Sequence, residues 1–322
     1  MKPARRHRLD AELVRRKLVA SRRMAEEAIE AGRVTVGGAP AGKPSRLVSP
    51  AEPIEIAPGG RRFASRGGDK LAPAIAHFDV DVRDRRVLDA GASTGGFTDC
   101  LLQFGARRVL AVDVGWGQLD ARLRADPRVV VIERTNIRDV TPELLLDAEL
   151  SHDARSYDAR SHDEITGSAR DPASGPAAES EWQPVDMVTA DLSFISLTKV
   201  VPVLLGPLVR AGGDAILLVK PQFEAGRSEV SRGRGVVRAP ATWYATLSAV
   251  ACALQDAGAA MMGVMPSPLT GPSGNREFFL HARAGADPGA LDDVDGALWA
   301  AVRSCDEASH PTTVPVPSAP DL

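Results

Sequence analysis

The chain has 322 residues, of which 44% are hydrophobic and 25% charged, and its net charge is −3; these values are ordinary for a globular protein with room for two domains. No run approaches the roughly 18 to 20 apolar residues that span a bilayer, and the basic start lacks the apolar core of a signal peptide, so we expect a cytoplasmic protein. The three cysteines are odd in number and far apart, which indicates reduced thiols and predicts no metal site.

Basic residues gather at the start of the chain. Residues 1–70 hold sixteen Lys and Arg against eight Asp and Glu, whereas the remaining residues hold 23 against 34. Charge segregated in this way favours a polyanion as the partner of the N-terminal part. A solvated basic face without a partner is the plain alternative.

The first sixty residues predict a compact α+β unit. Residues 9–18 carry apolar side chains at helical spacing. Ser21 is suited to cap a second helix and Gly32 to end it. Short strands are expected at 34–36 and 54–56, with glycine-rich turns after them.

This unit resembles the S4 RNA-binding domain, in the stretch from Arg8 through Ser21 to Gly38. The resemblance implies a domain over residues 1–60 that recognises the shape and the phosphates of RNA. The side chains expected to contact RNA are Arg6, Arg8, Arg15, Arg16, Lys17, Arg22, Arg23 and Arg33.

Beyond a linker at 61–66, short apolar runs alternate with helical patterns. Strands are expected near residues 86–90, 109–113, 129–132, 187–190, 215–219 and 276–283, and helices at 95–104, 195–208 and 240–258. This alternation predicts an α/β domain over residues 67–285, built on a doubly wound, mostly parallel sheet.

Two segments depart from this plan. Residues 148–183 are rich in Ser, Asp, Ala and Arg, and this composition predicts a disordered insertion between the third and fourth strands. Residues 286–322, which become rich in Pro and Ser towards the end, are expected to form a largely disordered tail.

The first strand of the α/β domain runs into a glycine-rich turn that ends at Gly96. Asp113 closes the next strand, where an acidic side chain accepts ribose hydroxyls in nucleotide-binding α/β folds. Ser93 replaces the glycine that lets a dinucleotide pyrophosphate approach, and S-adenosylmethionine has no phosphate, so we favour this methyl donor over NAD; a bare tight turn is the third interpretation. The expected cofactor-binding residues are Asp89, Gly91, Ser93, Gly95, Gly96 and Asp113.

Four ionisable residues, Lys70, Asp191, Lys220 and Glu277, stand in distinctive local sequences. Asp191 and Lys220 each end a strand, and ligands of open α/β sheets bind beyond the carboxyl ends of the strands. Each residue alone is typical of a surface ion pair. Together they match, in order and context, the Lys-Asp-Lys-Glu set of ribose 2′-O-methyltransferases of the RrmJ/FtsJ superfamily.

With the S4-like domain in front, nearly the whole chain resembles the TlyA (hemolysin A) family of ribosomal RNA methyltransferases, over roughly residues 5–146 and 184–283. The resemblance implies a Rossmann-like class I methyltransferase fold with seven strands, S-adenosylmethionine as cofactor, and ribosomal RNA in ribosomal subunits as partner. It implies methylation of a cytidine ribose 2′-hydroxyl, in 16S and 23S rRNA, since the arginine-rich start resembles the form that modifies both subunits. Phe63 is a departure, because relatives often carry Trp there.

The expected chemistry suits these residues. A ribose 2′-hydroxyl must lose its proton as it attacks the methyl group, and a lysine near another cation can have its pKa lowered enough to act as a base. Lys220 is the expected base and Lys70 the neighbouring cation, while Asp191 and Glu277 orient the lysines and the ribose. Positioning should dominate, because the methyl donor is already activated.

Two functions of other classes remain open. The hemolysin name suggests a membrane-active protein, although the sequence shows no long cationic amphipathic helix with aromatic anchors. The second is an RNA-binding protein without catalysis, against which the intact Lys-Asp-Lys-Glu set argues. The sequence does not indicate the modified nucleotide or the oligomeric state.

Overall fold

The computed structural model describes residues 6–19, 21–30, 32–57, 62–163, 181–226, 233 and 235–307. The chain divides into two compact units, Met1–Arg62 and Phe63–Leu322. The boundary falls inside the linker predicted at 61–66, because Phe63 is buried in the core of the second unit.

The N-terminal unit is small and mixed α+β. Leu9 and Leu13 from the first helix and Ile29 from the second pack against Val34 and Val36, so the two helices and the strands share one core. Its elements are β1 (His7–Arg8), α1 (Leu9–Arg15), α2 (Arg22–Glu30), β2 (Val34–Val36), β3 (Ala39–Pro40), β4 (Leu47–Val48) and β5 (Ile54–Ile56). They form a β1–β4 pair and a three-stranded β3-β2-β5 sheet.

Among the described residues of the second unit, seven strands form one sheet in the order β11-β12-β10-β9-β6-β7-β8. Only β12 runs antiparallel to its neighbours β10 and β11, so the predicted doubly wound, mostly parallel sheet is confirmed. The strands are β6 (Arg86–Ala90), β7 (Arg108–Val112), β8 (Val129–Ile132), β9 (Val185–Ala190), β10 (Val209–Val219), β11 (Ala259–Pro266) and β12 (Phe278–Ala284).

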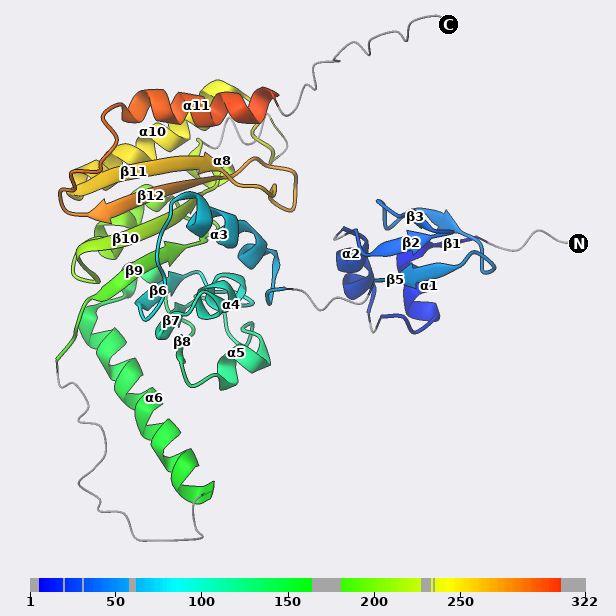
Figure 1. Ribbon diagram of the computed structural model, residues 1–322, viewed down its shortest axis with the longest axis horizontal. Coiled ribbons are helices and arrows are strands. Elements are labelled where there is room, and N and C mark those ends of the chain that lie inside the picture. The colour runs from blue at the N-terminus through cyan, green and yellow to red at the C-terminus, as the bar shows by residue number, and fades with distance from the viewer. Residues whose placement is uncertain are drawn as a thin grey trace, which may run out of the picture. The chain divides into compact units, whose positions relative to one another are not determined.

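Helices cover both faces of this sheet because its strands are apolar on both sides. Val87 and Met187 face a layer with α3, α4 and α5, whereas Leu88 and Val188 face a layer with α6, α7, α10 and α11; Figure 1 shows α10 and α11 side by side on that second face. The helices are α3 (Arg66–His77), α4 (Gly96–Gln103), α5 (Ala121–Ala125), α6 (Pro142–Asp163), α7 (Val201–Leu204), α8 (Pro221–Glu224), α10 (Pro240–Asp256) and α11 (Val294–Glu307), with 3₁₀ turns η1 (Ile137–Asp139) and η2 (Leu197–Lys199).

The predictions that residues 148–183 and 286–322 are disordered are wrong in part. The insertion was expected to begin at residue 148, but α6 continues to Asp163, where Glu149 and Asp153 pair with Arg86 and Arg108 at the starts of β6 and β7. The tail was expected from residue 286, but α11 buries Leu298 and Val302 against the sheet layer. Residues 164–180 and 308–322 lie outside the described residues.

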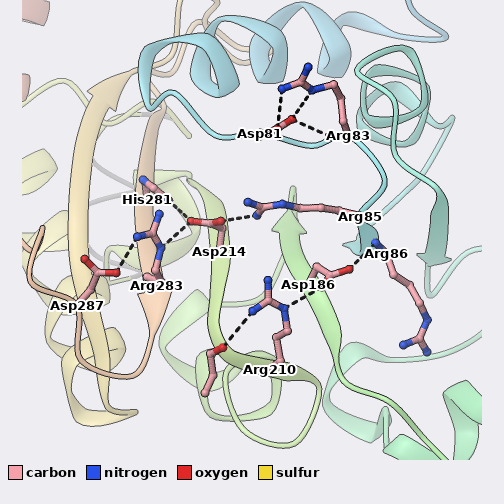
Figure 2. Close-up of polar contacts among 11 residues, drawn as sticks. Asp81, Arg83, Arg85, Arg86, Asp186, Arg210, Asp214, His281, Arg283 and Asp287 are labelled. Atoms are coloured by element: carbon pink, nitrogen blue, oxygen red, sulfur yellow. Dashed lines mark hydrogen bonds and ion pairs between the residues drawn. The ribbon is translucent and has the colours of Figure 1, made fainter.

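Arginines and carboxylates join the strands at the amino-terminal edge of the sheet. The carboxylate of Asp214 accepts hydrogen bonds from Arg85 and Arg283, and its Oδ1 lies 2.8 Å from His281 Nε2 (Figure 2). Burial raises the pKa of Asp214, but the hydrogen bonds with His281 and Arg85 outweigh it and hold that pKa well below its usual range. This network fixes β10 and β12 at the edge opposite the carboxyl ends of the parallel strands.

Candidate functional site

A pocket lies at the carboxyl ends of the parallel strands, where open α/β sheets bind their ligands. Two helices begin at it: Ser65 caps α3 by accepting a hydrogen bond from the Gly67 amide, and α4 starts at Gly96. The pocket is lined by Ser65, Gly67, Gly91, Ala92, Ser93, Thr94, Gly96, Phe97, Asp191, Ser193 and Lys220.

The glycine-rich turn is shaped by close packing. Gly91 has φ +86°, and a β-carbon there would lie 2.8 Å from the carbonyl oxygen of Asp191. Gly95 has φ +92° and would meet Leu123, while a β-carbon on Gly96 would come within 2.2 Å of Ser65 Oγ. The glycines therefore bring the starts of α3 and α4 together beside β9.

Asp113 follows β7 and anchors two neighbouring loops. Its Oδ2 accepts a hydrogen bond from the Ser93 amide at 2.8 Å, and its Oδ1 accepts one from the Gly115 amide at 2.6 Å. Each carboxylate oxygen has a second lone pair, so Asp113 retains acceptor capacity for a ligand at this turn.

Asp89 lies in β6 and does not line the pocket. Its side chain is fully buried behind the turn, where it accepts hydrogen bonds from the hydroxyls of Thr98 and Thr189 at 2.7 and 3.1 Å. Burial raises the pKa of Asp89 to about 7, against the opposing hydrogen bonds from the two threonines. In this position Asp89 supports the turn from behind, and its predicted role in binding the cofactor stays a prediction.

The four predicted catalytic residues form two ion pairs. Lys220 Nζ lies 2.5 Å from Asp191 Oδ1 and donates a hydrogen bond to Ser193 Oγ at 3.1 Å. Lys70 Nζ lies 2.6 Å from Glu277 Oε2, although 207 positions separate the two residues. Asp191 and Lys220 line the pocket, whereas Lys70 and Glu277 are not among its lining residues and are both buried.

One residue at this site was not singled out by the sequence. Phe194, in the loop after β9, is 91% exposed and adopts φ +66°, a conformation that is uncommon for a bulky residue. Its ring lies 5.1 Å from that of Phe223. An exposed aromatic side chain is a surface on which a nucleobase can stack. In the sequence, an aromatic residue between two serines shortly after the fourth predicted strand is the signal that could have marked Phe194.

The basic residues predicted to contact RNA fall into two groups. Arg8 and Arg22 pair with the buried Asp10, and Arg15 pairs with the buried Glu12, while all three keep about half of their side chains exposed. Arg6, Lys17 and Arg23 are exposed and Arg33 is half-buried. The buried acids thus orient arginines that remain accessible.

Arg16 differs from the other predicted RNA-contacting residues in its internal contacts, and its role toward RNA stays a prediction. Its guanidinium donates hydrogen bonds to Glu12 and to the backbone carbonyls of Ser49, Pro50 and Glu52, and only 20% of the side chain is exposed. Arg16 therefore holds α1 against the segment before β5. It belongs to the structure of the unit more than to its surface.

No group of three or more His, Cys, Asp or Glu side chains suited to a metal ion occurs among the described residues. Within the same residues, no helix combines the length and the apolar character needed to cross a membrane.

Comparison with known proteins matches both units. Residues 63–284 match the model of the FtsJ-like methyltransferases and residues 7–54 that of the S4 domain. The chain is 46% identical to the "16S/23S rRNA (cytidine-2'-O)-methyltransferase TlyA" of Mycobacterium tuberculosis, over 88% of this chain and 92% of that one. It is 34% identical to "Hemolysin A" of Brachyspira hyodysenteriae, over 81% and 93%. A solved structure, "Putative hemolysin from Streptococcus thermophilus", is similar with a TM-score of 0.63 and 32% identity, covering 94% and 96% of the two chains.

Proposed function

Because this chain belongs to the FtsJ-like methyltransferase family and also carries an S4 domain, we propose that it is a ribosomal RNA methyltransferase that modifies a cytidine ribose 2′-hydroxyl. The substrates are 16S and 23S rRNA, the RNAs named for the relative with 46% identity. The observation that carries the proposal is the placement of Lys220 and Asp191 in the wall of the pocket beside the glycine-rich turn. A protein with this role works with ribosomes in the cytoplasm.

The pocket fits S-adenosylmethionine as the methyl donor. The starts of α3 and α4 contribute Gly67 and Gly96 to the pocket wall, and helix starts favour a carboxylate such as that of the methionine part. Asp113, held by the Ser93 and Gly115 amides, is the acceptor for the hydroxyls of the adenosine ribose. When bound, this cofactor supplies a methyl group on a positively charged sulfur.

The chain's own residues then orient the ribose and take its proton. Lys220 is the base for the 2′-hydroxyl, and Asp191 and Ser193 fix its amine at the pocket wall. Lys70 is held by Glu277 in a buried ion pair, so its role is to place a positive charge within the domain and not to contact the RNA. General bases of this kind contribute roughly 10² to 10⁴ in rate, and the rest comes from orientation.

Phe194 supports a nucleotide substrate. Its exposed ring stands in the loop that also carries Asp191 and Ser193, and base–aromatic stacking contributes about 1 to 3 kcal/mol per base. A stacked base would present its own ribose towards Lys220. In the N-terminal unit, Arg8, Arg15, Arg22 and Arg23 are among the residues that bind RNA phosphates.

The function is tested by mapping 2′-O-methyl groups on ribosomal RNA after incubation of unmodified 30S and 50S subunits with the protein and S-adenosylmethionine. We expect one cytidine in each subunit to gain the group. Retention of all unmodified riboses would contradict the function.

Reversal of charge at Arg22 and Arg23 should weaken RNA binding and reduce its salt dependence, whereas Arg16→Ala should lower the melting temperature of the protein.

A further inference from the structure

The loops that follow β9 and β10 are joined by the carboxylate of Glu224. Oε2 of Glu224 accepts a hydrogen bond from Ser196 Oγ at 2.5 Å, and Oε1 accepts one from the Leu197 amide at 2.8 Å. We call this arrangement of Glu224, Ser196 and Leu197 the Glu224 clasp. Burial raises the pKa of Glu224, and the hydrogen bonds from Leu197 and Ser196 oppose that rise.

Two segments run side by side here: one follows β9 and the other follows β10. The clasp joins them at one end, and the Lys220–Asp191 ion pair joins them at the other. Lys220 begins the second segment and contacts Asp191 and Ser193 in the first. Glu224 ends the second segment and contacts Ser196 and Leu197. The Asp191–Leu197 segment is therefore bound to the Lys220–Glu224 segment at both ends.

Phe194 lies between the two points of attachment. Its φ of +66° costs free energy and persists only where the surroundings impose it. The ring contact with Phe223 supplies one constraint, and the clasp, two residues further along the chain, supplies another. The clasp acts together with the Lys220 contacts, the Phe223 ring and the packing of Leu192 and Ile195 against the core.

We propose that Glu224 is a positioning residue, which fixes the loop bearing Asp191, Ser193 and Phe194 against Lys220 for methyl transfer. The inference rests on the proposed function, because the chemistry being positioned is the transfer to RNA. Glu224 does not line the pocket and lies outside the Lys-Asp-Lys-Glu set. Its effect should fall on the chemical step more than on the binding of the methyl donor, since Asp113 follows a different strand and is held by the Ser93 and Gly115 amides.

The test compares Glu224→Ala and Glu224→Gln with Glu181→Ala, a control in which an exposed glutamate is truncated. Single-turnover transfer to ribosomal subunits, affinity for S-adenosylhomocysteine by calorimetry, and amide hydrogen exchange of the peptide containing residues 192–197 are measured for each. For Glu224→Ala we expect transfer to fall at least tenfold, affinity to stay within twofold, and exchange at Leu197 to become at least tenfold faster.

Glu224→Gln should recover part of the rate, because its amide oxygen still accepts from Leu197 and its NH₂ group can donate to the Ser196 hydroxyl, which then acts as the acceptor. Transfer at the wild-type rate by Glu224→Ala, or unchanged exchange at Leu197, would overturn the proposal. An equal loss of donor affinity and of transfer would also overturn it, since Glu224 would then only stabilise the domain. Absence of transfer by the wild-type protein would instead refute the proposed function.

Discussion

The α-carbon of Gly271 packs directly against the carboxylate of Glu277, because a β-carbon at Gly271 would lie 2.7 Å from Glu277 Oε1. The same carboxylate holds Lys70 through its other oxygen at 2.6 Å. Gly271 therefore leaves the space in which the buried Lys70–Glu277 pair is formed.

Gly271→Ala should displace the Glu277 side chain and weaken its pair with Lys70. Overpacking of this kind typically costs about 1 to 3 kcal/mol, so we expect single-turnover methyl transfer to fall about tenfold or more. Gly226→Ala is the matched control, since no atom of the described residues lies within 4 Å of a β-carbon there. Equal rates in the two variants would show that the position of Glu277 does not limit catalysis.

Lys220→Arg should retain binding and lose chemistry. Arginine keeps the positive charge beside Asp191 but does not give up a proton at usable pH. We expect donor and RNA affinities near those of the wild type, and methyl transfer reduced by about a hundredfold or more. Single-turnover kinetics at saturating donor isolate this step. Substantial transfer by the variant would mean that the 2′-hydroxyl proton leaves by another route.

Asp113→Ala should weaken the binding of the methyl donor and leave the binding of RNA unchanged. The variant loses an ionised acceptor, and hydrogen bonds to charged groups contribute about 1.5 to 3 kcal/mol, so affinity for S-adenosylhomocysteine should fall roughly 10- to 150-fold. RNA binding measured without donor should not change. Calorimetry that gave the wild-type affinity would remove Asp113 from the site.

Asp89→Asn should change how stability depends on pH. Burial raises the pKa of Asp89 from 3.8 to about 7 in the folded protein, so the folded state holds a proton that the unfolded state releases. Wild-type stability therefore falls as pH rises from about 4 to 7, by up to about 4 kcal/mol for a shift of this size.

The asparagine variant lacks this cost. Its advantage in the free energy of unfolding should be absent near pH 4, increase up to pH 7 and stay constant above it. Chemical denaturation at pH 5 and pH 8 measures the difference. An advantage of the same size at pH 5 and pH 8 would show that Asp89 is already ionised at pH 5 in the folded protein.

Replacement of residues 156–180 with a short Gly/Ser linker should leave methyl transfer within about threefold of the wild type. The described part of α6 reaches the body through Glu149 and Asp153, which pair with Arg86 and Arg108 at the amino-terminal edge of the sheet, whereas the pocket lies at the carboxyl ends. A stable variant without activity would indicate that this segment contacts RNA.

The parallel strands were predictable because each is a short apolar run between helical patterns. Strand β11 was not, because Ala259–Pro266 contains three methionines and a glycine and no clear alternation. Helix α3 was missed as a helix since Gly67, Gly68 and Pro73 all disfavour one; the Ser65 cap and the contact between Gly68 and Phe63 compensate.

The sequence grouped Lys70, Asp191, Lys220 and Glu277 and predicted that the two acids orient the two lysines, but it did not indicate which acid pairs with which lysine. Lys70 and Glu277 are far apart along the chain, and only the pairing of β12 with β10 brings Glu277 into place. The burial of Asp89 and of the Arg16 guanidinium depends on side chains from distant segments. Local sequence carries no signal for such contacts.

The two ion pairs make the catalytic centre electrically balanced. Lys70 with Glu277 and Lys220 with Asp191 sum to zero charge, so the pocket exerts little attraction on a polyanion beyond a Debye length of about 8 Å at physiological ionic strength. The long-range capture of RNA then falls to the arginines of the N-terminal unit. The rate of RNA association should accordingly fall as ionic strength rises, while the rate of methyl transfer within the bound complex should not depend on salt.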